Sequence, residues 1–161
     1  MPDLLKTLDL RNTFVSIDAI ACEQSNAELI VEKKGHYLLA LKKNQGLLYE
    51  QVTQRMQQNK LQLPVDEDID FGSGRIETRR CSVESNLSLY DDLQDWPSCQ
   101  SVIMIEVSRE INGLINHQTR YYLSDLVLPA AHFNSAVRHH WGIENHRAAG
   151  AVTLVSGHGL P

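Results

Sequence analysis

The sequence reads TFVSID at residues 13–18 and HYLLAL at residues 36–41, and these two runs decide the fold. Both are dominated by apolar residues, which is typical of strands that are buried on both faces. Residues 25–34 have the apolar spacing of a helix, and Gly35 is suited to end it. A strand, a helix and a strand within about 30 residues predict a parallel strand pair with a right-handed crossover, and therefore an α/β domain.

The middle of the chain has the pattern of a β-rich segment. Residues 75–83 are expected to form an exposed strand. Residues 102–107 and 119–123 read as two further strands, joined around Asn112-Gly113, a dipeptide that is common in hairpin turns. The sequence therefore predicts antiparallel strands after the parallel unit.

A last helix is expected to follow Pro129, a residue that suits the first turn of a helix. Phe133, Val137 and Trp141 recur every four residues along it and predict a buried face. Residues 148–161 contain no Asp, Glu, Lys or Arg and have no clear period. This tail is therefore expected to be irregular.

Composition limits the class of protein. The 161 residues suit one domain, and no apolar run approaches the roughly 20 residues of a membrane span. Three scattered cysteines favour neither a disulfide framework nor a zinc cluster, so a cytoplasmic protein without a membrane segment is expected. The net charge of −5 argues mildly against a free-standing DNA-binding module. It is compatible with a nuclease core, where carboxylates gather around metal ions.

Two carboxylates stand out by their position. Asp18 ends a buried strand, and ligands in open α/β sheets gather beyond the carboxyl ends of strands. Glu144 follows Val137 by seven residues, which returns it close to the apolar face of the last helix. Carboxylates from distant parts of a chain commonly hold Mg²⁺ for phosphoryl chemistry. The alternative is that Asp18 only caps a turn and Glu144 is solvated.

The histidines of the same helix do not form a zinc-protease motif. His139, His140 and His146 lie close to Glu144, but the His-Glu-x-x-His pattern is absent. A hydrolytic zinc site is therefore disfavoured.

Five blocks of sequence, in order, closely resemble the H-repeat-associated group of bacterial insertion-sequence transposases. Together the resemblance covers about residues 2–146. The blocks are VSIDAIAC at 15–22, LLALKKNQG at 38–46, GRIETR at 74–79, TRYYLS at 119–124 and VRHHWGIEN at 137–145.

The resemblance implies a DDE transposase with a ribonuclease-H-like fold. In that family an Asp, a second Asp and a Glu hold two divalent ions, Mg²⁺ or Mn²⁺, for DNA strand cleavage and strand transfer. Asp18 matches the second Asp and Glu144 matches the Glu. Residues 1–147 are then expected to be a partial catalytic core, in which residues of about 70–125 form a β-rich insertion before the Glu-bearing helix.

The same resemblance implies DNA as a partner, both the ends of the insertion sequence and the target. Several residues in the matched blocks are expected to bind DNA or to support the catalytic carboxylates. They are Lys42, Asn44, Gln45, Arg75, Arg138, Trp141 and Asn145.

The chain also departs from the family pattern. The family's first Asp belongs to an earlier strand with no counterpart before Asp18, so the chain is expected to be inactive alone and to leave one edge of its sheet bare. Ser73 stands where the family has His. The pattern breaks after His146, as a shifted reading frame would cause. The alternative function is a truncated regulatory or protein-binding fragment that pairs with intact transposase or occupies its DNA. A homo-oligomer is a further partner prediction.

Overall fold

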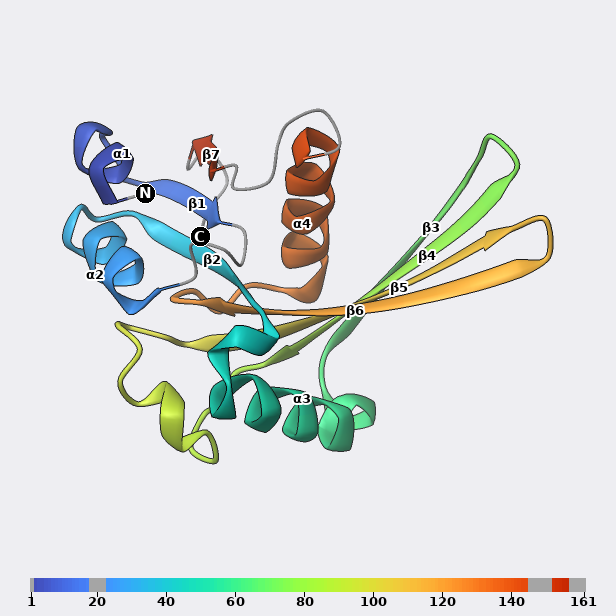
Figure 1. Ribbon diagram of the computed structural model, residues 1–161, viewed down its shortest axis with the longest axis horizontal. Helices are drawn as coiled ribbons and strands as arrows, with labels where there is room; N and C mark the ends of the chain where they lie inside the picture. Colours follow the sequence, from blue (N-terminus) through green and yellow to red (C-terminus); the bar gives the residue numbers. More distant parts are fainter. Residues whose placement is uncertain (1, 18–22, 145–151, 157–161) are drawn as a thin grey trace.

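The computed structural model describes residues 2–17, 23–144 and 152–156, and all their side chains except those of residues 2, 44, 139–144 and 152–156 (Figure 1). Four helices, seven strands and three short 3₁₀ segments occur among the described residues. They are α1 (Pro2–Thr7), β1 (Thr13–Ile17), α2 (Gln24–Glu32), β2 (His36–Leu41), η2 (Lys43–Gln45), α3 (Leu47–Asn59), η3 (Lys60–Gln62), β3 (Val65–Gly72), β4 (Arg75–Glu84), η4 (Asp91–Leu93), β5 (Ser101–Ile111), β6 (Leu114–Ser124), α4 (Ala130–Glu144) and β7 (Val152–Ser156).

The strands form one mixed sheet in the order β3-β4-β5-β6-β2-β1-β7. β1 and β2 are parallel, with Val15 opposite Tyr37, and the helix α2 connects them. The other neighbouring strands in this order are antiparallel. The parallel unit and the α/β class that the sequence predicts are therefore confirmed.

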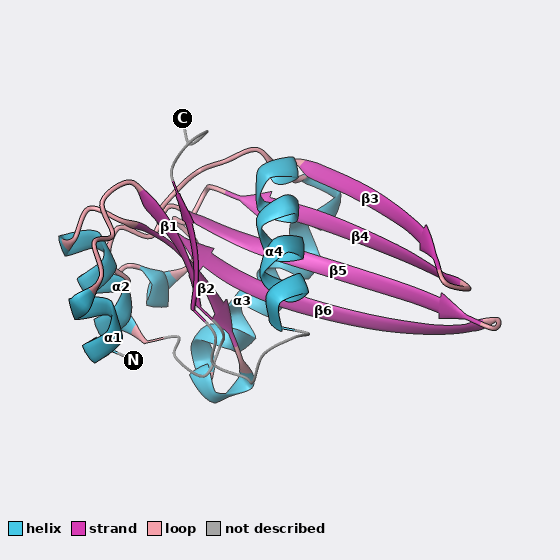
Figure 2. Ribbon diagram, turned by 90° about the horizontal axis from the view of Figure 1, so that it is seen from above, coloured by secondary structure: helices cyan, strands magenta, loops and turns pink. Residues whose placement is uncertain are grey.

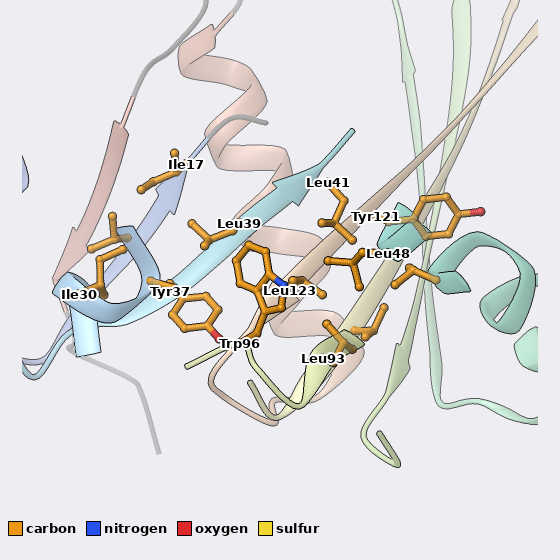
Figure 3. Packing of buried hydrophobic residues seen from close by; sticks show 14 of the residues in the cluster. Ile17, Ile30, Tyr37, Leu39, Leu41, Leu48, Leu93, Trp96, Tyr121 and Leu123 are labelled. Atoms are coloured by element: carbon orange, nitrogen blue, oxygen red, sulfur yellow. The ribbon is translucent and has the colours of Figure 1, made fainter. Parts of the chain in front are cut away.

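The sheet is covered on both faces, because alternate residues of a strand point to opposite sides. One core lies between the sheet and the helices α1, α2 and α3, and it includes residues from all three (Figure 3). The second core lies between the sheet and α4 (Figure 1). Its members include Phe14, Leu38, Ile103, Tyr122 and Phe133.

Strands β3 to β6 form a long ribbon whose far end projects past α3 and α4 (Figure 2). Asn112 and Gly113 join β5 to β6 with φ angles of 52° and 79°, as a two-residue hairpin turn of the primed type requires. The predicted hairpin is therefore confirmed. The strand predicted at residues 75–83 is β4, but it is not exposed throughout, because its second half is buried between β3 and β5.

The tail expected to be irregular contains β7, so that expectation is wrong for Val152–Ser156. β7 pairs antiparallel with β1, with Leu154 opposite Val15. Val152, Thr153 and Val155 are β-branched, which favours a strand. The edge of β1 that was expected to be bare is therefore paired.

Among the described helices, none has the length and apolar character needed to cross a membrane.

Candidate functional site

The two carboxylates singled out by the sequence adjoin β1 and α4. β1 ends at Ile17, and Asp18 lies outside the described residues. The helix α4 includes Glu144 as its last residue, but the Glu144 side chain also lies outside the description. α4 starts directly after Pro129, as the sequence predicts. In its first turn the backbone amide of His132 donates to the carbonyl of Pro129 at 3.0 Å.

β1 and α4 pack into the same core. Phe14 of β1 shares one buried cluster with Phe133 and Val137 of α4. Ser16 lies two residues after Phe14 and therefore on the same side of the sheet. Its side-chain oxygen is buried and has no hydrogen-bond partner among the described residues. The α4 side of β1 thus contains an unsatisfied polar atom close to the end of the strand.

Ionic contacts with β3 hold α4 against the sheet. The Arg138 guanidinium donates to the carboxylate of Asp68 at 2.7 Å and to that of Asp70 at 3.5 Å. One turn earlier, the side-chain amide of Asn134 donates to Asp66 at 2.9 Å. The three aspartates alternate along β3, so all lie on the face that α4 covers. Arg138 is therefore engaged with two carboxylates of β3.

A second cluster of charged side chains lies on β4 and β5. The carboxylate of Glu77 accepts hydrogen bonds from Arg79 at 2.8 Å and from Arg109 at 2.7 Å. Burial lowers the pKa of Arg79, and the nearby Arg138 lowers it further, while Glu77 and Asp68 oppose these effects. Asp68 consequently faces positive charge from both β4 and α4. The acidic residues of β3 compensate for arginines that would otherwise repel each other.

The predicted DNA-binding or supporting residues that follow β2 are Lys42, Asn44 and Gln45. They lie at the edge of the sheet where β1 also ends, because β1 and β2 are parallel neighbours. Lys42 is exposed and directly follows β2, and Gln45 is half-buried within η2. The side chain of Asn44 lies outside the description. Lys42 is therefore placed where a cation could contact a ligand bound beyond the strand ends.

Arg75 is not brought to this end of the sheet. It is the first residue of β4, lies opposite Gly72 and Ile111, and is exposed. The turn between β3 and β4 lies at the far end of the ribbon from β1 (Figures 1 and 2). The Trp141 side chain and Asn145 lie outside the described residues.

Sequence reasoning missed the three aspartates of β3. Asp66, Asp68 and Asp70 contact a helix that lies about 70 residues further along the chain. Their period of two was a signal for a strand with one polar face. It was overlooked because acidic residues are generally rare in strands.

The described residues contain no group of three or more His, Cys, Asp or Glu side chains that could hold a metal ion. The expected ligands Asp18 and Glu144 would supply carboxylate oxygens, the donors that Mg²⁺ and Mn²⁺ favour. The buried hydroxyl of Ser16 adds an unsatisfied oxygen on the α4 side. The donor types available here therefore fit the expected ions.

A hollow of about 410 Å³ lies on the opposite face of the sheet from α4. Lys60, Arg80, Glu106 and His117 are among its lining residues, and Lys60 is paired with Glu106 at 3.5 Å. Because this hollow faces the α3 side, it does not belong to the candidate site beside α4.

Comparison with known proteins gives one family match and several similar proteins. Residues 1–148 match the family described as the transposase DDE domain. A protein of Xanthobacter autotrophicus, described as an uncharacterized protein in the dhlA 3′ region, is 36% identical over 77% of this chain and 43% of its own length. The putative transposase YncI of Escherichia coli O157:H7 is 30% identical over 90% of this chain and 39% of its own length.

The H repeat-associated putative transposase YhhI of Escherichia coli K12 is also 30% identical, over 90% of this chain and 40% of its own length. The chain thus spans about two fifths of the length of these curated relatives. No solved structure matches the chain.

Proposed function

The chain belongs to the transposase DDE domain family, and we propose that Asp18 and Glu144 are two of the carboxylates with which the whole protein holds divalent ions for DNA strand cleavage and strand transfer. One observation carries this proposal. β1, which ends directly before Asp18, and α4, which ends at Glu144, pack into one core through Phe14 and Phe133.

The two carboxylates act as metal ligands in this proposal. Bound Mg²⁺ or Mn²⁺ would activate water and stabilise an in-line phosphoryl transfer. The proposal requires the Asp18 carboxylate to reach the α4 side of the sheet, where the Ser16 hydroxyl is available to donate a hydrogen bond to it. Lys42, exposed beyond β2, is suited to contact a DNA phosphate at the same end of the sheet.

DNA cleavage and joining are proposed for the whole protein, since the chain spans only about two fifths of its relatives. In this proposal, Asp18 and Glu144 are two of the three carboxylates that the resemblance to the family implies. We therefore expect the chain to show no Mg²⁺-dependent nicking on its own. Nicking of supercoiled DNA that Asp18→Ala abolishes would contradict this expectation.

Metal binding tests the two carboxylates directly. Mn²⁺ binding is measured by electron paramagnetic resonance for the chain, for Asp18→Asn and for Glu144→Gln. Each substitution is expected to weaken binding on the order of tenfold or more. Glu50→Gln, which changes an exposed residue of α3, is the matched control and should bind as the unchanged chain does. Equal Mn²⁺ affinity in all four proteins would refute the assignment.

A second candidate function is pairing with an intact transposase or with another copy. Large apolar side chains at the far end of the ribbon favour it: Phe71 is 72% exposed and Leu114 is 78% exposed. Co-purification with a full-length relative, weakened by Leu114→Ser, would support this function. Unchanged recovery of the relative with the variant would count against it.

A further inference from the structure

The outer part of the ribbon has one apolar face, which lies on the α3 side of the sheet. Tyr121 of β6 points to this side, because the Gln57 side chain of α3 donates to its hydroxyl at 3.2 Å. Ile115 precedes Tyr121 by an even number of residues and therefore points to the same side. Cross-strand register places three residues of β3, β4 and β5 in one row with Ile115. This row, called the tip row, consists of the exposed residues Phe71, Ile76, Glu110 and Ile115.

The tip row contrasts with the other face of the same strands. On that face the next row contains Asp70, Glu77 and Arg109, which are all charged. Ile69 shares the face of Phe71 and extends the apolar surface, because it is also exposed. Antiparallel sheets with one apolar and one polar face commonly pack the apolar face against another layer. The α3 side of the ribbon is therefore suited to pack against a partner.

The hollow of about 410 Å³ lies on this same face, between the tip row and η3. Leu61 of η3 lines it and is 86% exposed. Arg80 of β4 also lines it, is half-buried, and makes no hydrogen bond or ion pair among the described residues. Lys60 is paired with Glu106 at 3.5 Å, and the exposed Glu67 completes the charged lining. The hollow thus offers an apolar side chain and an unpaired cation to a partner.

The position of α3 limits how a second copy can fit on this face. α3 covers its inner part, where Met104 and Tyr121 lie beneath the helix. Two copies stacked with their ribbons in the same direction would bring both α3 helices into the same space, whereas copies with reversed ribbons avoid this clash. Ile76 and Arg80 are four residues apart on β4, so a reversal about Thr78 places the tip row of each copy over the hollow of the other. A two-fold axis makes the two contacts identical.

In this reversed arrangement the two surfaces complement each other in charge. The tip row carries one charged residue, Glu110, which makes no hydrogen bond or ion pair among the described residues. The reversal places Glu110 over Glu106 of the second copy, whose charge is already paired with Lys60. Arg80 lies opposite Glu106 in the register and is therefore next to the incoming Glu110. Each copy thus supplies the charge that the other leaves unpaired.

We propose that the α3 side of the ribbon binds a second copy of this chain, with the tip row of each copy seated over the hollow of the other. Phe71 then packs against Leu61 of the second copy, and Glu110 pairs with its Arg80. The proposal rests on the second candidate function, pairing with another copy, and is independent of the proposed metal site.

The size of this surface predicts weak association. Four strands about 4.8 Å apart and five residues about 3.4 Å apart give a face of roughly 19 by 17 Å. This flat area is about 320 Å², compared with about 800 Å² per partner in a stable complex. We therefore expect pairing that depends on protein concentration and not a permanent dimer.

Sedimentation equilibrium of the full chain over a range of protein concentrations tests the proposal. Arg80→Glu and Glu110→Arg each place like charges at both contacts of a homodimer, so each is expected to weaken self-association on the order of tenfold. An equimolar mixture of the two variants should restore it, because one contact keeps the original pair and the other has the pair exchanged. Arg75→Glu is the matched control, since Arg75 precedes Ile76 on β4 and points to the other face.

A double variant, Arg80→Glu with Glu110→Arg in one chain, covers the case in which a single variant does not fold, and it should associate as the unchanged chain does. Self-association that neither single variant weakens would refute this surface but leave pairing of copies standing. A mixture that associates no better than the single variants would refute the reversed arrangement. A chain that stays monomeric at every concentration would refute pairing of copies and this proposal with it. If Arg80→Glu then weakened co-purification with a full-length relative, the surface would bind the intact transposase instead.

Discussion

At the scale of single residues, Gly35 lies between α2 and β2 and packs against the backbone that precedes β1. The sequence predicts that Gly35 ends the helix, and the positive φ of 61° near this helix end belongs to Lys34. The space around Gly35 gives the better reason for a glycine. A Cβ there would lie 2.8 Å from the carbonyl oxygen of Leu10 and 3.2 Å from a methyl carbon of Ile30.

Gly35→Ala is therefore expected to lower the free energy of unfolding by about 1–3 kcal/mol, the range for overpacking a rigid site. Urea denaturation measures this difference. Gly72→Ala is the matched control, because a Cβ at Gly72 would have no heavy atom within 4 Å. Equal loss of stability in both variants would show that the close approach to Leu10 is not the cause.

Lys33 fixes α1 to α2. Its ammonium donates to the carbonyl oxygens of Leu5 at 2.8 Å, Lys6 at 2.6 Å and Leu8 at 2.6 Å, which uses all three of its donors. Lys33→Met keeps the apolar stem and removes these bonds. We expect it to cost about 1–3 kcal/mol of stability, measured by urea denaturation. The exposed Lys43→Met is the control, and a Lys33→Met variant as stable as this control would contradict the prediction.

Cys81 gives a prediction about pH. Burial, and secondarily Asp66, raises the pKa of the Cys81 thiol from 9.0 to about 12. As pH rises above 9 the unfolded thiol ionises while the folded thiol keeps its proton, so the contribution of Cys81 to stability is lost as pH rises from about 9 towards 12. The free energy of unfolding should fall less steeply between pH 9 and 11 in Cys81→Ala than in the unchanged chain. Parallel slopes in the two proteins would refute the shifted pKa.

At the scale of elements, the contact between β3 and α4 predicts an energetic coupling between Asp68 and Arg138. Both side chains are about half exposed, so the pair is expected to contribute about 0.2–1 kcal/mol. A double-mutant cycle of Asp68→Asn and Arg138→Gln, followed by urea denaturation, measures this coupling. The control cycle replaces Asp68→Asn by Glu67→Gln, since Glu67 points to the opposite face of β3. A coupling no larger than in the control would show that the ion pair does not hold α4.

The sequence predicted those elements whose pattern is independent of distant contacts. β1 and β2 are runs dominated by apolar residues, and Asn112-Gly113 specifies its own turn, so all three could be located from local residues. β3 was missed because its inner face consists of aspartates, which only the cations and amides of α4 make favourable. β7 was missed because its short run forms a strand only beside β1.

The candidate site was predictable to a similar degree. Asp18 and Glu144 stood out by their positions on a strand and a helix, and the resemblance to transposases gave them roles that remain proposals. That Phe14 and Phe133 share a core could not be derived from spacing, because it depends on which face of the sheet α4 covers. The distance of Arg75 from β1 likewise follows from the length of the ribbon (Figure 1).

At the scale of the whole molecule, we expect the turns of the ribbon to promote association between molecules and its buried part to stabilise the fold. Phe71 and Leu114 lie at the turns of the two hairpins, beyond the helices, and are 72% and 78% exposed. Exposed apolar side chains add little to folding, but a group of them promotes contacts between molecules. Phe71→Ser with Leu114→Ser should therefore change the free energy of unfolding by no more than about 0.5 kcal/mol per site while reducing self-association in sedimentation velocity.

The control for this prediction lies in the same ribbon. Val107, on β5, is 4% exposed and belongs to the core beneath α4. Val107→Ser should destabilise the chain clearly, by about 1–3 kcal/mol, because it buries an unpaired hydroxyl and removes apolar contacts. If the double substitution at the turns costs as much as Val107→Ser, the turns must be packed in solution. If it leaves sedimentation unchanged, association must arise elsewhere, and the outer edge of β7, uncharged like β1, would be the next surface to test.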